Sequence, residues 1–350
     1  MTSFRRVRWL CVLIVLLYAA RPASAEMPAT RPAGKTVRVL AIGNSFSGNA
    51  LKYLPQLAEA GGHRLVAVNA YIGGASFERH MKAVAAFEAD PNDKAGRPYK
   101  ITGDDGKPKM VSLRELLQSQ PWEFVTLQQS SPLSYKPESY QPCADQLVAY
   151  VHQFAPQAKL LLHQTWAYRV DHDLFKHGDF TQQQMYQRIT AGYQSLATHI
   201  GAAGVIPAGT AIQNMREDPR WIESIEYTDP KTLKKPDQIS HSLNADYYWG
   251  TLPGGRSGFV TDRFHLSPAG CLIAGAVWYE FFFHDDVRQN AFVPKDVPAD
   301  EAVWFKEIAP PNRHRRRPPE APRQHTAGDH GLKPPGDFLC FSADKPLPRR

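Results

Sequence analysis

The most informative stretch of the sequence is Val37-Arg38-Val39-Leu40-Ala41-Ile42-Gly43-Asn44-Ser45-Phe46-Ser47. An apolar run, interrupted only by Arg38, stops at Gly43, which is typical of a strand covered by helices on both faces. A polar turn and a helical pattern follow. Because α/β sheets bind ligands at the carboxyl ends of their strands, Ser45 stands where a reacting group would lie. The alternative is that Asn44 and Ser45 only cap the next helix.

Strand and helix patterns alternate along the rest of the chain. Four more apolar runs, each followed by a polar turn, predict strands at residues 64–70, 124–127, 159–163 and 205–207. Repeated alternation of this kind indicates a parallel sheet with helices on both faces. We therefore expect an α/β fold with a five-stranded parallel sheet.

The helical patterns have recognisable ends. One helix is predicted over residues 50–60, where Pro55 favours a break or kink, and another over residues 138–154. Ser267 and Pro268 are a natural N-cap and first residue for a mostly apolar helix that follows. Residues 216–260 interrupt the alternation with an aromatic-rich insertion, and long insertions in compact domains are usually functional.

Both ends of the chain differ from its body. A positive segment, a short apolar run and Ala23-Ser24-Ala25 predict a signal peptide at residues 1–25, so we expect a secreted or periplasmic protein with no stable membrane span after cleavage. A linker is expected at residues 26–35, one large domain at 36–309 and a disordered basic tail at 310–350. The net charge of +7 comes from the two ends, so the body has no electrostatic footprint for nucleic acid.

One Asp-x-x-His pair stands directly before the predicted apolar helix. A serine nucleophile needs a base, and the base needs a group that orients it. Asp262 and His265 are three residues apart, so Asp262 can hold one imidazole nitrogen while the other faces Ser45. The chain order is then Ser, Asp, His.

Three loops at the same edge of the sheet offer donors for an oxyanion. They contain the backbone N–H of Ser45, the Gly73-Gly74 turn after the second strand, and the side-chain amides of Gln128 and Gln129 after the third. Taken alone, the glycine pair fits an ordinary helix-entry turn and the glutamines fit ordinary loop polarity.

Together these residues resemble the SGNH (GDSL-like) hydrolases. Gly43-Asn44-Ser45 is similar to their nucleophile block, Ile72-Gly73-Gly74 to their second block, and Asp262-x-x-His265 to their last. The resemblance covers about residues 36–285 and implies a flavodoxin-like three-layer α/β/α sandwich. It implies Ser45 as nucleophile, Gly74 as a backbone oxyanion donor, His265 as base and Asp262 as its orienter.

The chain departs from that family at two places. Asn44 replaces an Asp, and Leu127-Gln128-Gln129 stands where the family has Gly-x-Asn-Asp, so Gln128 or Gln129 has to replace the asparagine donor. The sequence is similar to a secreted subgroup with Leu-Gln here and Gln-Thr-Trp after the fourth strand. Gln164 and Trp166 of that motif, at the end of the fourth strand, are predicted to contact substrate. The alternative is that they only pack in the core and the loop.

These features predict a secreted serine esterase that hydrolyses small acyl esters, with an O-acetyl ester of a carbohydrate as the expected substrate. No cofactor is expected. Cysteine spacing gives no metal site, and the His/Asp-rich residues 171–179 match no known one, so no metal ligand is predicted. The alternatives are a catalytically impaired protein that binds glycans and an exported scaffold without catalysis. The oligomeric state cannot be predicted.

Overall fold

The computed structural model describes residues 34–103, 105–233, 239–252 and 254–309. The predicted signal peptide, nearly all of the linker and the basic tail lie outside these ranges. Within the described ranges, no helix has both the length and the apolar character that crossing a bilayer requires.

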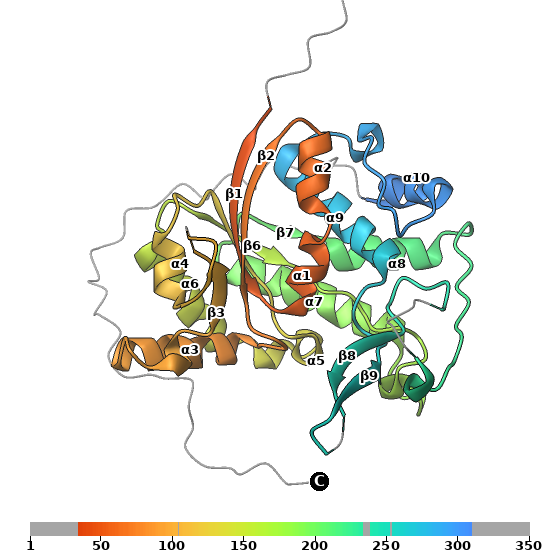
Figure 1. The fold of residues 1–350 in the computed structure, drawn as a ribbon, viewed down its shortest axis with the longest axis horizontal. Helices are drawn as coiled ribbons and strands as arrows, with labels where there is room; N and C mark the ends of the chain where they lie inside the picture. The colour runs from red at the N-terminus through yellow and green to blue at the C-terminus, as the bar shows by residue number, and fades with distance from the viewer. Residues whose placement is uncertain (1–33, 104, 234–238, 253, 310–350) are drawn as a thin grey trace, which may run out of the picture. The chain divides into compact units, whose positions relative to one another are not determined.

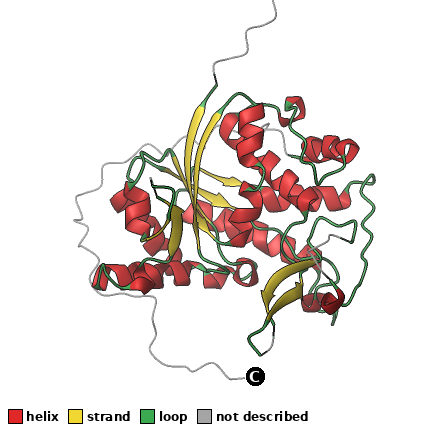
Figure 2. Ribbon diagram, in the orientation of Figure 1, coloured by secondary structure: helices red, strands yellow, loops and turns green. Residues whose placement is uncertain are grey.

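A five-stranded parallel sheet forms the centre of the domain (Figures 1 and 2). Its strands, in spatial order, are β2 (Arg64–Tyr71), β1 (Thr36–Gly43), β5 (Phe124–Leu127), β6 (Lys159–His163) and β7 (Gly204–Ile206). Numbered along the chain these five run 2-1-3-4-5, the flavodoxin-like order. The predicted fold class is therefore confirmed. The order reverses between β1 and β5, and ligands bind at such a reversal.

Helices flank the sheet. Their bounds, in chain order, are α1 (Ser45–Leu51), α2 (Leu54–Ala60), α3 (Phe77–Ala89), α4 (Leu113–Gln118), α5 (Ser131–Ser134), α6 (Cys143–Phe154), α7 (Gln182–His199), α8 (Ala208–Glu217), α9 (Pro268–Phe283) and α10 (Ala299–Ile308). Helix α9 is apolar on all sides and almost wholly buried, and α1, α2, α8 and α10 all pack against it. Helices α3 and α4 pack against α6 (Figure 1).

Two predicted helices differ from the structure for reasons visible in the sequence. The helix expected at residues 50–60 is two helices, because α1 already begins at Ser45 and Pro55 lies in the first turn of a separate α2. The helix expected at residues 138–154 begins only at Cys143, since Pro142 ends the preceding segment. As predicted, Ser267 caps α9 through a bond from Gly270 N and Pro268 is the first residue of α9.

Two antiparallel hairpins lie outside the main sheet. The first joins β3 (Tyr99–Thr102) to β4 (Pro108–Val111). The second joins β8 (Tyr247–Thr251) to β9 (Ser257–Thr261) and lies in the aromatic-rich insertion, for which the sequence predicts no strand. Strand β9 leads directly to Asp262, so this hairpin determines where the Asp-x-x-His turn begins.

Candidate active site

Ser45 is the first residue of α1 and follows β1 directly. Asn44 is the N-cap: its side-chain oxygen accepts from Phe46 N at 3.0 Å. Ser45 makes no such cap bond, and its Oγ lies 2.7 Å from His265 Nε2. Capping therefore explains Asn44 but not Ser45, because the Ser45 hydroxyl is directed at an imidazole 220 positions further along the chain.

His265 lies between Ser45 and Asp262. Its Nδ1 is 2.6 Å from Asp262 Oδ2, and its side chain is 19% exposed, against 1% for Asp262. The other carboxylate oxygen, Oδ1, accepts from the backbone N–H groups of Phe264 and His265, both at 3.0 Å. Three donors therefore fix the Asp262 carboxylate, and the ring it holds presents Nε2 to Ser45.

The turn that carries His265 is attached to α1. Leu266 N donates to Asn49 Oδ1 at 3.1 Å, one helical turn beyond Ser45. Trp166 adds a second tie, because its indole N–H donates to Phe264 O at 2.7 Å while its ring stacks on Phe46 with centroids 4.2 Å apart. These contacts set the spacing between the hydroxyl and the imidazole.

Trp166 and Gln164 do not contact the pocket described below, contrary to the sequence-based prediction. Trp166 has no exposed surface, and its side chain instead connects Phe264 to Phe46, as described above. The Gln164 side chain is buried beneath α8: its Oε1 accepts from Thr210 N and Oγ1, both at 3.0 Å, and its Nε2 donates to Thr190 Oγ1 at 2.8 Å. Every polar atom of this amide has a partner inside the protein.

The Gly73-Gly74 turn lies beside the Ser45 turn. Gly74 has φ +65°, a left-handed conformation that glycine adopts without strain, and nothing lies within 4 Å of the position a Cβ would take. Asn44 Nδ2 donates to Ala75 O at 2.9 Å and so ties the two turns together. Among the described residues neither Ser45 N–H nor Gly74 N–H has an acceptor, so both are available to a bound oxygen.

The glutamine amides after β5 are turned away from this site, which corrects the prediction that one of them supplies an oxyanion donor. Gln128 Oε1 accepts from Ser47 N and Oγ, and its Nε2 donates to Gln129 O. Gln129 Oε1 accepts from Phe77 N and Ser130 N. Its Nε2 donates to Ser139 O at 3.1 Å. Both side chains are wholly buried and hold the loop together.

A pocket of about 440 Å³ opens beside Ser45. Ser45 and Gly74 form one wall together with Asn44 and Phe46, and the remaining lining residues are Ser131, Pro132, Tyr135, Tyr168, His172, Leu174 and Phe264. No Lys, Arg, Asp or Glu belongs to this lining. The volume lies in the range of small-molecule sites, and the walls are suited to an uncharged ligand.

Most of these lining residues were missed from the sequence. Six of them come from α5, from the residue directly after it and from the segment after β6, where no motif marks them, and Phe264 lies inside the Asp-x-x-His turn. His172 is an example: its Nδ1 accepts from Leu174 N at 3.1 Å, and burial lowers its pKa. Because Nδ1 accepts in this bond, Nε2 is the nitrogen that carries the proton of the neutral ring.

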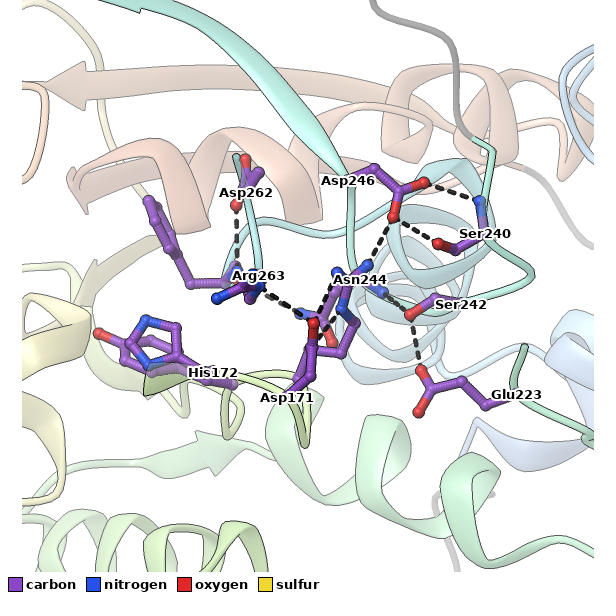
Figure 3. A network of polar contacts seen from close by, with 12 residues as sticks. Asp171, His172, Glu223, Ser240, Ser242, Asn244, Asp246, Asp262 and Arg263 are labelled. Carbon is purple, nitrogen blue, oxygen red and sulfur yellow. Dashed lines mark hydrogen bonds and ion pairs between the residues drawn. The ribbon is translucent and has the colours of Figure 1, made fainter. Parts of the chain in front are cut away.

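A buried network of hydrogen bonds and ion pairs holds the turn that carries Asp262 (Figure 3). Arg169 Nη1 lies 2.6 Å from Asp246 Oδ1, and both side chains are 2% exposed. Asp246 O accepts from Asp262 N at 2.6 Å, and Arg169 N donates to Arg263 O at 2.8 Å. Ser240 N and Oγ donate to the same Asp246 carboxylate. The insertion before β8 is thus bonded to the segment that carries Asp262.

Two acidic residues of the segment 171–179, Asp171 and Asp173, take part in ion pairs. Asp171 pairs with Arg169 at 2.6 Å and with Arg263 at 3.0 Å, and Asp173 pairs with Lys176 at 2.8 Å. No group of three or more His, Cys, Asp or Glu side chains in the described ranges is arranged to hold a metal ion.

The protein is therefore a parallel α/β protein with a candidate catalytic site. Ser45, His265 and Asp262 form a hydrogen-bonded line where the strand order reverses. Residues 38–226 match the family described as "Domain of unknown function (DUF4886)", and the chain belongs to that family. The match ends before Asp262 and His265. A search of curated proteins finds no match.

Solved structures extend the comparison. A DUF4886 family protein from Bacteroides uniformis is 29% identical, with a TM-score of 0.59 over 78% of this chain and 93% of that chain. A suggested SGNH hydrolase from Slackia heliotrinireducens is 19% identical, with a TM-score of 0.41 over 70% of this chain and 98% of its own. An acetyl xylan esterase is 13% identical, with a TM-score of 0.36 over 70% and 99%. SGNH hydrolases and esterases are thus among the distant structural neighbours.

Proposed function

We propose that this protein is a secreted serine esterase that hydrolyses small acyl esters, with O-acetyl groups on carbohydrates as the expected substrates. The observation that carries the proposal is the line of Ser45 Oγ, His265 Nε2 and Nδ1, and Asp262 Oδ2, with separations of 2.7 and 2.6 Å. A hydroxyl, a base and an orienting carboxylate at hydrogen-bond distance are the parts that nucleophilic catalysis needs.

The reaction has two halves. Ser45 Oγ bonds to the ester carbonyl carbon while His265 Nε2 takes the hydroxyl proton, and the N–H groups of Ser45 and Gly74 stabilise the oxyanion. As the tetrahedral intermediate collapses, the bond to the alcohol breaks and His265 returns the proton to the leaving oxygen. In the second half, His265 takes a proton from water as the water oxygen bonds to the acyl carbon. It passes that proton to Ser45 Oγ as the bond between Ser45 and the acyl group breaks, which releases the acid and restores the serine.

The substrate class rests on the pocket. Its lining has no ionised side chain, which favours neutral esters over charged ones, and it includes three aromatic residues, Tyr135, Tyr168 and Phe264, which suit a sugar ring. A small acyl group fills little of a cavity of about 440 Å³, so the alcohol has room in the same pocket. Export, with a secreted or periplasmic location, belongs to the proposal and rests on the signal-peptide pattern.

A glycan-binding protein with impaired catalysis is the second candidate. It is favoured by one observation: neither Gln128 nor Gln129 presents its amide to the pocket, so the donor expected after β5 is missing from that position. This candidate predicts binding of acetylated sugars without their hydrolysis.

Hydrolysis assays on the mature protein separate the two candidates. The panel comprises p-nitrophenyl acetate, p-nitrophenyl butyrate and acetylated xylose, with Ser45→Ala, His265→Ala and the surface control His199→Ala. We expect acetate turnover that both site variants lose and the control keeps. Turnover that survives Ser45→Ala contradicts the esterase mechanism, and binding without turnover in the unaltered protein favours the glycan-binding alternative.

A further inference from the structure

The loop after β5 carries a hydroxyl at the pocket although its two amides are turned inward. Gln128 and Gln129 are both fully buried and bonded to backbone groups, so they cannot reach an oxyanion without breaking those bonds. Two residues further on, Ser131 lines the pocket together with Ser45 and Gly74. This loop therefore does present a donor to the site, but from a different residue than the sequence suggests.

The hydroxyl of Ser131 is held by a neighbouring phenol. Tyr168 Oη donates to Ser131 Oγ at 3.0 Å. Tyr168 is buried, and burial raises the pKa of its phenol, so the phenol stays protonated and remains a donor. Because Ser131 Oγ accepts in this bond, its own proton is left for another acceptor, and none is found among the described residues.

The neighbouring serines do not share this arrangement. Ser134 Oγ donates to Ser131 O at 3.0 Å and is wholly buried. The Ser130 side chain makes no cap bond for α5, and Ser130 does not line the pocket. Of the three, Ser131 alone combines contact with the pocket and a hydroxyl fixed by a second side chain.

We infer that the Ser131 hydroxyl is the third oxyanion donor of the proposed esterase and that Tyr168 is its positioning residue. As the Ser45 Oγ–carbon bond forms, the carbonyl π electrons move to the carbonyl oxygen, which then accepts from Ser45 N, Gly74 N and Ser131 Oγ. Ser131 keeps its proton throughout, because the proton of Ser45 goes to His265. This inference rests on the proposed function.

An oxyanion donor acts on the transition state, so its removal should change kcat rather than KM. For Ser131→Ala we expect kcat to fall by about 10²-fold, at the lower end of what loss of one donor costs, with KM within about twofold. Ser131→Thr keeps a hydroxyl and should recover most of the lost rate. Tyr168→Phe leaves the hydroxyl in place without its partner, so its kcat should lie between those of Ser131→Ala and the unaltered protein.

The test measures kcat and KM of the mature protein on p-nitrophenyl acetate for these three variants, with Ser130→Ala as the matched control. Thermal unfolding confirms that each variant is folded. The inhibition constant of a boronic acid, whose tetrahedral adduct with Ser45 places an oxygen among the same donors, should rise with Ser131→Ala in parallel with the fall in kcat.

The outcomes distinguish this inference from the proposed function. Unaltered kcat in Ser131→Ala, or equal losses in Ser131→Ala and Ser130→Ala, overturns the role of Ser131 and leaves Ser45 as nucleophile. A loss in Ser131→Ala that appears in KM alone also overturns it, since that result marks a substrate contact. Absence of turnover in the unaltered protein overturns the proposed function, and this inference with it.

Discussion

Asn44 Nδ2 donates to Ala75 O at 2.9 Å and thereby joins the turn that carries Ser45 to the turn that carries Gly74. The same side chain caps α1 through its Oδ1 and is 1% exposed. One buried amide thus sets the distance between the two backbone N–H groups assigned to the oxyanion. An aspartate, the residue that the SGNH pattern has here, has no donor for Ala75 O once it is ionised.

Substitution of Asn44 should therefore impair the site in two different ways. Asn44→Ala removes the cap and leaves Ala75 O unpaired, so we expect the free energy of unfolding to fall by about 1–3 kcal/mol. Asn44→Asp keeps the cap but sets a carboxylate against a carbonyl oxygen, and kcat should fall at least about tenfold through misplacement of the donors. Urea unfolding and p-nitrophenyl acetate kinetics measure the two effects. Full activity in Asn44→Asp would mean that the tie to Ala75 is dispensable.

The Arg169–Asp246 pair should affect both stability and rate, because Asp246 O holds Asp262 N. Asp246→Asn leaves Arg169 with less compensating charge in a buried position, and breaking such a pair costs about 3–5 kcal/mol. We expect the free energy of unfolding to fall by about 3–5 kcal/mol and kcat to fall with little change in KM. The measurements are chemical denaturation and steady-state kinetics.

A matched control is the exposed pair of Asp145 and His199, 3.0 Å apart. Asp145→Asn should change stability by less than about 1 kcal/mol and leave kcat unaltered, since exposed pairs contribute little. If Asp246→Asn behaves like Asp145→Asn, the buried network does not position Asp262.

Gln128 should behave as a structural residue. Its Oε1 is the acceptor for both the N–H and the hydroxyl of Ser47, so Gln128→Leu leaves two buried donors unpaired, at about 1–3 kcal/mol each. We expect a lower melting temperature, with kcat of the folded fraction within a few-fold of the unaltered value. Differential scanning calorimetry measures the melting temperature. Active-site titration counts the folded protein, to which kcat is then referred. A stable Gln128→Leu protein with kcat reduced 100-fold would return Gln128 to the role of oxyanion donor.

His163 should make the fold sensitive to acid. Burial lowers its pKa to about 3, and neither ring nitrogen has a hydrogen-bond partner among the described residues. An imidazole in the unfolded chain titrates near 6.5, so between these values the unfolded state binds more protons, and stability is lost as pH falls below about 6.5. The slope from this residue is at most about 1.4 kcal/mol per pH unit.

His163→Phe removes that contribution. Between pH 7 and pH 5 the free energy of unfolding of the unaltered protein should fall by about 2 kcal/mol more than that of the variant. The comparison with the variant is needed because other groups titrate as well: burial lowers the pKa of His80 to about 4 and raises that of Glu280 to about 7, and these two act in opposite directions. Parallel pH profiles for the two proteins would rule out His163 as the source.

The sheet could be predicted from the sequence because its strands are short apolar runs with clear stops. Residues 124–127 and 159–163 coincide with β5 and β6, and the reversal of strand order brings the ends of β1 and β5 together. The sequence misplaces helix starts where proline is present, as at Pro55 and Pro142, since a periodic pattern does not tell a break from a kink.

The Ser45–His265–Asp262 geometry follows from two local signals, the turn after the first strand and the Asp-x-x-His pair, but no such signal marks the pocket walls. Tyr168 and His172 reach the pocket through an irregular segment, which is held by the ion pair of Arg169 with Asp246, 77 positions further along the chain. Gln128 shows the opposite failure. The sequence predicts that this polar residue at the end of a strand faces the substrate, whereas its side-chain oxygen accepts from the N–H and the hydroxyl of Ser47 inside the protein.

The most direct test of the central claim is stoichiometric labelling of the mature protein with a fluorophosphonate, followed by intact mass and peptide mapping. The account predicts one adduct per chain, located on Ser45, absent from Ser45→Ala and formed far more slowly in His265→Ala. A stoichiometric adduct on another residue, or an unlabelled Ser45 in a protein that still hydrolyses p-nitrophenyl acetate, would contradict it.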